Sequence, residues 1–523
     1  MQQKKLIQIL NKQYTKNIYI FLLILSSLLF PFHYGYIGIY PIDSFLIYDS
    51  GYKIINGYHP FKDYWSITGP ILDYIQYIYF KFFGINWFSY VFHAASMNLL
   101  ISIAIFYFFL NLKIGLFYSF VYSLSVSILA YTSAGTPFMD HHAVIFSLIS
   151  VMLLFLSFET NNKIYWFLVP IFLAFSFLSK QIPSAYLFFL FTIFIFVFSL
   201  IKLQKNYKFL FYLSFGGALS LCVFTAIFLI NNIPFENFLI QYFYYPLEIG
   251  EERGLKTNLN FNNAFFQFKF IYISLIPLAY VLLTIFKNNL NFEIKKDLLQ
   301  ISFICSSIIL FIYGQLMTKN QILIFFLIPF CLGISHYYCK KYCNKIFIIS
   351  FLMLILVFTT TKYHIRFNEN KKFMELSNVE LNLSVNAISL DKSLKGLKWI
   401  TQSYPENPKE ELTKLSKIIK IIQSDNTKKI LITDYQVLPS ILKLKTSAPN
   451  KWFDDLSVPD MNNKYYKNYQ EFFIKNLITQ KIETIYIFKK KEEYLTKILK
   501  KDCYNKKLIN EILFRFEISN CLK

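Results

Sequence analysis

Residues 184–201 read SAYLFFLFTIFIFVFSLI, a run of eighteen positions without one charged side chain. A helix needs about 20 mostly apolar residues to cross the hydrocarbon core of a bilayer. Similar runs fill most of the first 361 residues, and the segments between them carry most of the lysines in this part of the chain. The run therefore predicts a polytopic α-helical membrane protein.

Eleven runs reach or approach this length. They lie roughly at 17–33, 87–110, 114–131, 142–158, 164–179, 184–201, 209–230, 267–286, 298–316, 322–338 and 346–361. No small-residue cleavage site follows the first run, so we interpret it as an uncleaved anchor rather than a signal peptide. The sequence predicts about 11 transmembrane helices.

The charges divide the chain. Of its 84 Lys, Arg, Asp and Glu residues, 49 lie in 362–523, and the whole chain is only 16% charged. Soluble domains carry about 25% charged residues. We therefore predict a transmembrane domain over 1–361 and a soluble domain over 362–523. The net charge of +22 is spread along loops, which favours membrane orientation over nucleic-acid binding.

The lysines also predict the orientation. With the N-terminus inside, fifteen of the 23 basic residues before position 362 fall on the inner side, as the positive-inside rule expects. The first outer loop is then 34–86, the second is 132–142, and the C-terminal domain is periplasmic. Only three of the 53 basic residues are arginine, a bias typical of low-GC bacterial genomes. We predict a multi-pass protein of the bacterial inner (cytoplasmic) membrane.

The C-terminal domain has the pattern of a small α/β fold. Residues 428–434 (KKILITD) and 481–488 (KIETIYIF) are β-branched runs that predict buried strands. Residues 408–424 and 469–480 have helical apolar spacing. Cys503 and Cys521 are the only cysteines in this domain, so an oxidising outer compartment predicts a disulfide between them.

The first outer loop contains a short amphipathic segment. Residues 69–83 are apolar but interrupted by Asp73 and Lys81, which predicts a helix at the membrane interface rather than a span. Asn56-Gly57 and His59-Pro60 predict a turn before it.

Residues 40–84, YPIDSFLIYDSGYKIINGYHPFKDYWSITGPILDYIQYIYFKFFG, resemble the first periplasmic loop of GT-C glycosyltransferases. The shared features are Asp43 soon after the first span, then NGYHPFKDYW, then Gly-Pro opening an amphipathic helix. GTPFMDHHA, at 135–143, is similar to the second acidic loop of that family through Asp140. One difference is Ser44, where the protein mannosyltransferase group often has a second acidic residue.

The resemblance implies a GT-C-like fold and an inverting hexosyl- or pentosyltransferase of cell-envelope synthesis. Its partners would be a polyprenyl-phosphate sugar donor, a lipid, glycan or protein acceptor, and membrane lipids. Such a transfer needs a carboxylate that accepts the proton of the acceptor hydroxyl and a cation near the leaving phosphate. No cofactor is required, although a divalent cation at His141 and His142 is an open alternative.

These requirements assign candidate residues. Asp43 is the expected base, and Asp140 is the second catalytic candidate. Substrate-binding candidates share an outer-loop position or the outer end of a span: Asp49, His59, Asp63, His141, Lys180, Gln181, Arg253 and Lys319.

Structural interpretations stay open beside these. Asp140 can cap the following helix, Asp49 can pair with Lys53 four residues on, and Lys319 can extend to the membrane interface. Arg253 can pair with the adjacent Glu251 or Glu252. A polytopic lipid or sugar flippase, or another transporter, is the alternative function, and a membrane scaffold is the third class.

Overall fold

A computed structural model describes residues 2–131, 135–201, 208–256, 262–287, 291–318, 324–343, 346–372 and 376–519. The chain divides into two compact units. The first, called here the helical unit, takes Met1–Gly35, Ala94–Cys222 and Thr257–Phe373. The second, the α/β unit, takes Tyr36–His93, Val223–Lys256 and Met374–Lys523. The distribution of charge along the chain predicts a single boundary at residue 361. Each unit is instead assembled from three separate segments.

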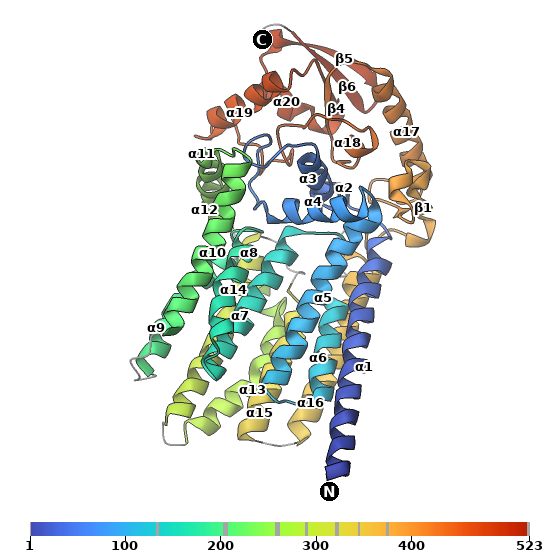
Figure 1. The fold of residues 1–523 in the computed structure, drawn as a ribbon. Helices are drawn as coiled ribbons and strands as arrows, with labels where there is room; N and C mark the ends of the chain where they lie inside the picture. Colours follow the sequence, from blue (N-terminus) through green and yellow to red (C-terminus); the bar gives the residue numbers. More distant parts are fainter. Residues whose placement is uncertain are drawn as a thin grey trace. The chain divides into compact units, whose positions relative to one another are not determined.

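Long helices lie side by side in the helical unit (Figure 1). Their bounds are α1 Gln2–Gly35, α5 Trp87–Asn111, α6 Leu116–Leu129, α7 Met139–Thr160, α8 Lys163–Phe177, α9 Ser184–Ile201, α10 Lys208–Ile230, α13 Lys269–Ile285, α14 Phe292–Thr318, α15 Leu327–Tyr342 and α16 Ile346–Tyr363. The first turns of α5 and the end of α10 belong to the α/β unit. Each of the eleven apolar runs is therefore helical.

Seven of these helices are long and apolar enough to span a bilayer within the described part of the chain. They are Gln13–Gly35, Trp87–Asn111, Met139–Thr160, Ser184–Ile201, Lys208–Ile230, Phe292–Thr318 and Ile346–Glu369. Helices α6, α8 and α13 are apolar but shorter, and α15 ends in Lys340 and Lys341. The chain is a polytopic membrane protein, and the full count of eleven spans stays a prediction.

Polar side chains join the helices where apolar contacts alone give little specificity. The Asn98 amide of α5 donates hydrogen bonds to the carbonyl oxygens of Ser27 in α1 (3.0 Å) and Ser127 in α6 (2.8 Å). The Ser176 hydroxyl of α8 donates to the Ala143 carbonyl of α7 at 2.7 Å. Such bonds fix the mutual rotation of helices within a membrane, where hydrophobic burial does not distinguish helix faces from lipid.

A four-stranded sheet forms the centre of the α/β unit, in the order β3-β4-β6-β5. Its strands are β3 Lys429–Ile432, β4 Thr484–Phe488, β5 Tyr504–Asn510 and β6 Leu513–Ile518. β3 pairs with β4 in parallel, with Ile430 opposite Ile485. β6 runs antiparallel to both β4 and β5. The predicted strands at 428–434 and 481–488 are confirmed as β3 and β4, and β4 is buried at every position.

Helices surround this sheet and extend the unit. The helices with their bounds are α2 Pro41–Ser44, α3 Leu46–Ile55, α4 Ile71–Phe83, α11 Phe235–Phe238, α12 Tyr245–Lys256, α17 Pro408–Ser424, α18 Leu438–Ile441, α19 Tyr466–Thr479 and α20 Glu492–Ile498. A two-stranded ribbon joins β1 Val385–Asn386 to β2 Lys398–Trp399. The predicted helices at 408–424 and 469–480 are confirmed as α17 and α19. Pro408 starts α17 one residue after Asn407, whose side chain caps the helix.

The segment after α1, predicted as the first outer loop, is an integral part of the α/β unit from Tyr36 onward. Trp65 is 1% exposed and lies edge-on to Tyr469 and Phe472, with ring centroids 5.2 and 5.7 Å away. Its backbone exchanges hydrogen bonds with Pro449 and Lys451 (3.1 and 2.9 Å). The predicted helix at 69–83 is confirmed as α4, and Gly57 follows α3 at a φ of 84° that suits glycine. The loop therefore folds with the C-terminal segment rather than as a separate element.

Cys503 is buried and disulfide-bonded, whereas Cys222, Cys305, Cys331, Cys339 and Cys343 are free. Its predicted partner, Cys521, lies outside the described residues. We expect non-reducing peptide mapping of membrane-extracted protein to recover a linked Cys503–Cys521 peptide. A bridge closing so short a loop contributes roughly 3 kcal/mol. Recovery of both cysteines as free thiols, from a strain able to form disulfides, would contradict the predicted bridge and weaken the periplasmic assignment.

Candidate functional site

The turn at Asn161 and Asn162 brings two predicted site residues together. It joins α7 to α8, and the two helices pack against each other as a hairpin. Asp140 lies about twenty residues before this turn and Lys180 about as many after it. At 1.5 Å rise per residue the two positions reach the same level of an antiparallel pair. Helix geometry thus places Asp140 beside Lys180.

Asp140 and Lys180 form an ion pair. The Lys180 Nζ atom donates to Asp140 Oδ1 at 2.6 Å. The Asp140 side chain is 4% exposed, whereas the Lys180 side chain is 19% exposed. A charged pair held at this distance and away from water interacts more strongly than a surface pair. The Lys180 side chain is therefore less completely buried than its partner.

The predicted capping role of Asp140 is wrong. Helix α7 begins at Met139 after the flanking residue Phe138, and no side chain caps it. Asp140 is therefore inside the first turn, where a carboxylate is favourable for the helix dipole. Its side chain pairs with Lys180.

The two histidines next to Asp140 are buried against aromatic side chains. His142 Nδ1 lies 2.9 Å from the Tyr131 hydroxyl and 3.1 Å from the Phe138 carbonyl oxygen. The His141 ring centroid lies 4.6 Å from that of Tyr131. The described residues contain no group of three or more His, Cys, Asp or Glu that could hold a metal ion. The divalent-cation alternative therefore stays a prediction.

Asp43 lies in α2, a single turn of the α/β unit that follows Tyr40. Its side chain is half-buried and its backbone N–H donates to the Tyr40 carbonyl at 3.0 Å. The indole N–H of Trp452 donates to the Ile42 carbonyl at 3.1 Å. The C-terminal segment thus fixes α2 through backbone contacts that do not use the Asp43 carboxylate.

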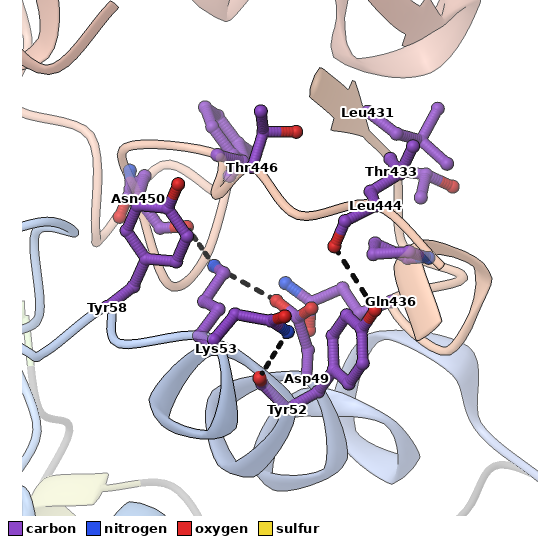
Figure 2. Close-up of a pocket in the computed structure, with 14 residues that line it drawn as sticks. Asp49, Tyr52, Lys53, Tyr58, Leu431, Thr433, Gln436, Leu444, Thr446 and Asn450 are labelled. Carbon is purple, nitrogen blue, oxygen red and sulfur yellow. Dashed lines mark hydrogen bonds and ion pairs between the residues drawn. The ribbon is translucent and has the colours of Figure 1, made fainter. Parts of the chain in front are cut away.

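A small polar pocket surrounds Asp49 in the same unit (Figure 2). Asp49 Oδ2 pairs with Lys53 Nζ at 2.9 Å, as the spacing of four predicts, and Lys53 also donates to the Asn450 carbonyl at 3.1 Å. The hollow holds about 20 Å³, room for about one water molecule. Asp49 Oδ1 and Gln436 Oε1 are both buried and lack a hydrogen-bond partner among the described residues. The pocket therefore offers two acceptors to one hydroxyl group or water.

The pKa of Asp49 is raised by burial, and the neighbouring Lys53 opposes this shift. Two tyrosines close the pocket, because Tyr52 donates to the Leu444 carbonyl (3.1 Å) and Tyr58 to the Lys445 carbonyl (2.8 Å). As it stands, the pocket admits a single polar group rather than a sugar ring.

Sequence reasoning missed a buried ion pair beside this pocket. Lys451 Nζ lies 2.7 Å from Asp73 Oδ1, and the Tyr64 hydroxyl donates to Asp73 Oδ2 at 3.0 Å. Both charged side chains are at most 2% exposed. The sequence pattern predicts Asp73 as a residue of the amphipathic helix at the membrane interface. No local signal could reveal its partner, which lies 378 residues away in the chain.

His59 and Asp63 contact each other locally. The His59 backbone N–H donates to Asp63 Oδ2 at 2.7 Å, and its ring Nδ1 lies 3.2 Å from the Tyr74 hydroxyl. Burial, aided by Lys62, lowers the pKa of His59 to about 4, so the ring is neutral at pH 7. Burial raises the pKa of Asp63. His59 and Asp63 thus form a turn, in which the His59 imidazole is neutral.

The remaining candidates are placed in part. Gln181 is half-buried next to Lys180, and its carbonyl accepts a hydrogen bond from the Ser184 hydroxyl at 3.0 Å. Arg253 lies in α12, but its side chain is not among the described ones, and Lys319 lies outside the described residues.

No family model matches the sequence, and no curated protein matches it. Among solved structures, the chain is similar to an oligosaccharyltransferase from Archaeoglobus fulgidus, crystallised with Zn and sulfate. The two share 13% sequence identity, the match covers 90% of this chain and 68% of that one, and the TM-score is 0.42. A likeness at this level leaves the function to be argued from the site.

Proposed function

We propose that this chain is a membrane glycosyltransferase that moves a sugar from a polyprenyl-phosphate donor to an acceptor on the outer face of the membrane. The observation that carries the proposal is the Asp140–Lys180 ion pair. It joins the two outer-end residues that the sequence singled out separately, one as a carboxylate for the reaction and one as a cation for the donor phosphate.

The pair has the properties that donor binding requires. The leaving group is an anionic phosphate, which a positioned ammonium stabilises. The Asp140 carboxylate holds the Lys180 ammonium in one place, at 2.6 Å, before the donor arrives. Because the Lys180 side chain keeps 19% exposure, it can exchange part of its contact with Asp140 for a phosphate oxygen. Lys180 is therefore the proposed donor-binding cation, and Asp140 is its positioning partner.

Asp43 is the proposed base. An acceptor hydroxyl becomes nucleophilic when a carboxylate removes its proton as the new glycosidic bond forms. The bond from the anomeric carbon to the donor phosphate breaks in the same step, so the anomeric centre inverts. The half-buried carboxylate of Asp43 lies on a turn anchored by Trp452, which suits a group that must keep its position.

The composition of the α/β unit supports an outer location of the loop and the C-terminal segment. A folded unit cannot lie on both sides of a bilayer. The chain must therefore cross the membrane an even number of times between each of the three segments of the unit and the next. Six helices, α5 to α10, join the first segment to the second, and four, α13 to α16, join the second to the third. This parity is compatible with the proposed eleven spans, and together with a lysine-rich N-terminus it supports the proposal that the α/β unit is periplasmic.

The direct test is sugar transfer by the purified full chain in detergent, from a synthetic polyprenyl-phosphate sugar. We expect time-dependent release of polyprenyl phosphate when an acceptor extract is added. Uptake of the lipid-linked sugar into proteoliposomes without release of polyprenyl phosphate would instead support the transporter alternative and refute the transferase.

Replacing Lys180 with Ala is expected to raise the KM for the donor at least about tenfold, which corresponds to about 1.4 kcal/mol of lost binding. Lys163→Ala, at the other end of α8, is the matched control and should leave KM unchanged. Lys319→Ala should have a smaller effect than Lys180→Ala.

Lys180→Ala also leaves the buried Asp140 carboxylate without its partner, so folding needs its own control. The double variant Asp140→Asn/Lys180→Ala removes both charges and should fold normally while keeping the high KM. Partial recovery by Lys180→Arg is expected as well. If KM for the donor is normal in the double variant, Lys180 does not bind the phosphate.

A further inference from the structure

An apolar groove runs along α1 of the helical unit, between α1 and α6, which pack side by side (Figure 1). Its walls include Leu22, Leu25, Leu29 and Phe30 of α1, with Phe120 and Leu124 of α6. The α1 residues recur at helical spacing, so they form one stripe along the helix. The groove has a volume of about 400 Å³.

The dimensions fit one lipid chain. The stripe extends from Leu22 to Tyr34, which is roughly 18 Å along the helix at 1.5 Å per residue. One leaflet contributes half of a hydrocarbon core of about 30 Å. Leu25 and Leu29 are 42% and 57% exposed although they lie within a membrane-spanning helix. The groove therefore spans one leaflet and opens toward the lipid.

Its inner wall is fixed by polar contacts. The Ser26 hydroxyl lies 3.0 Å from the Ser127 hydroxyl of α6. The Phe30 ring lies edge-on to His364, with centroids 5.7 Å apart, and the Tyr34 hydroxyl lies 3.3 Å from His364 Nε2. These contacts keep the groove from closing.

The groove ends at a polar cluster. His33 and Tyr34 form its last wall, and His33 is exposed there. The Lys371 ammonium donates to the Tyr34 carbonyl and lies 5.5 Å from the centroid of the Tyr34 ring. Lys371 is 0% exposed.

The charge of Lys371 has no counter-charge in the described part of the chain. No carboxylate there lies within ion-pair distance of it, and the nearby Glu369 carboxylate lies 3.5 Å from His364 Nε2. Burial holds the pKa of Lys371 at about 7, well below that of an ordinary lysine. An anion at the end of the groove would stabilise the protonated form through a medium of low dielectric constant.

We propose that this groove is a site for one anionic phospholipid of the bilayer, with an acyl chain along Leu25 and Leu29 and the phosphate beside His33 at the Tyr34 end. The imidazole of His33 can donate a hydrogen bond to a phosphate oxygen. The buried charge of Lys371 selects an anionic headgroup over a zwitterionic one. This site is independent of sugar transfer, because it uses neither Asp43 nor the Asp140–Lys180 pair.

Native mass spectrometry of the purified full chain tests the proposal, with phosphatidylglycerol and phosphatidylcholine of identical acyl chains as probes. We expect one phosphatidylglycerol to be retained at least about tenfold more than phosphatidylcholine. Leu25→Trp, which fills the groove, should abolish retention of both lipids. Phe21→Trp is the matched control on the same helix, because Phe21 is 63% exposed and lies outside the groove.

The headgroup is tested separately. Lys371→Met should bring the preference for phosphatidylglycerol close to one, whereas Lys362→Met, whose lysine lies over the Phe270 ring, should leave it unchanged. Lys371→Gln replaces Lys371→Met if the latter fails to fold. Retention by Leu25→Trp, or an unchanged preference in the Lys371 variants, would overturn the site. Displacement of phosphatidylglycerol by stoichiometric polyprenyl phosphate would overturn the assigned occupant, and it would leave the test of sugar transfer intact.

Discussion

Replacing Asp43 with Asn will lower the kcat of sugar transfer at least about a hundredfold, the usual contribution of a general base. Asparagine has nearly the same shape but cannot accept the proton of the acceptor hydroxyl. The backbone contacts of α2 with Tyr40 and Trp452 do not involve the carboxylate, so these contacts should persist, and the KM for the donor should stay close to that of the unmodified chain. The measurement is steady-state transfer from a synthetic polyprenyl-phosphate sugar.

Glu410→Gln is the control for this prediction. Glu410 is a carboxylate of the same unit on the exposed side of α17, 46% exposed and paired with Lys414. Its replacement should leave kcat unchanged. Transfer by Asp43→Asn within a few-fold of the unmodified rate would remove Asp43 from the mechanism, whatever happens to the proposals on Lys180.

Replacing Asp73 with Asn will destabilise the α/β unit by about 3–5 kcal/mol, the usual cost of breaking a buried ion pair from one side. Lys451 would then remain 2% exposed and without its counter-ion. The side-chain oxygen of the new asparagine could still accept the hydrogen bond from Tyr64. The loss of stability would therefore measure the missing charge. For a unit of this size the melting temperature should fall by roughly 6–20 °C, which intrinsic tryptophan fluorescence on heating measures.

Two further variants make this test specific. Asp73→Asn/Lys451→Met removes both charges and should recover part of the loss, because no buried ion is left unpaired. Glu410→Gln breaks an exposed pair at the same 2.7 Å separation, and water screening should leave the melting temperature nearly unchanged. Equal melting temperatures for Asp73→Asn and Glu410→Gln would contradict a stabilising role for the buried pair.

The local predictions depend on patterns that a few consecutive residues contain. A long apolar run satisfies its own backbone hydrogen bonds in a membrane as a helix, and each of the eleven runs contains a helix among its described residues. Pro408 after the capping residue Asn407 fixed the start of α17 to the residue. The β-branched runs of β3 and β4 are buried in the sheet, as their composition predicted.

The β5–β6 hairpin had no such signal. β5 reads YNKKLIN, and most of its residues are exposed. An edge strand that carries lysines has no buried face, so its sequence need not alternate between apolar and polar residues. The turn at Glu511 and Ile512 also lacks the Asn-Gly or Asp-Gly pair that marks a two-residue hairpin.

The candidate site was predictable to different extents. The Asp49–Lys53 pair follows from a spacing of four on one helix. The Asp140–Lys180 pair follows from two helices of similar length around one turn, a signal that the sequence contains. Neither a spacing of four nor a helical hairpin predicts the Asp73–Lys451 pair or the buried Lys371. Each depends on segments that are far apart in the chain.

The sequence by itself determined which segments are apolar helices, that the runs of β3 and β4 are buried strands, and which residue types lie at the ends of the apolar helices. Only the tertiary structure decided that the first loop and the C-terminal segment form one unit, with Trp65 in its core and Asp73 buried against Lys451. The physical reason is the range of the interactions. Helix formation and capping act over a few residues, whereas the burial of a charge depends on every segment that excludes water from it.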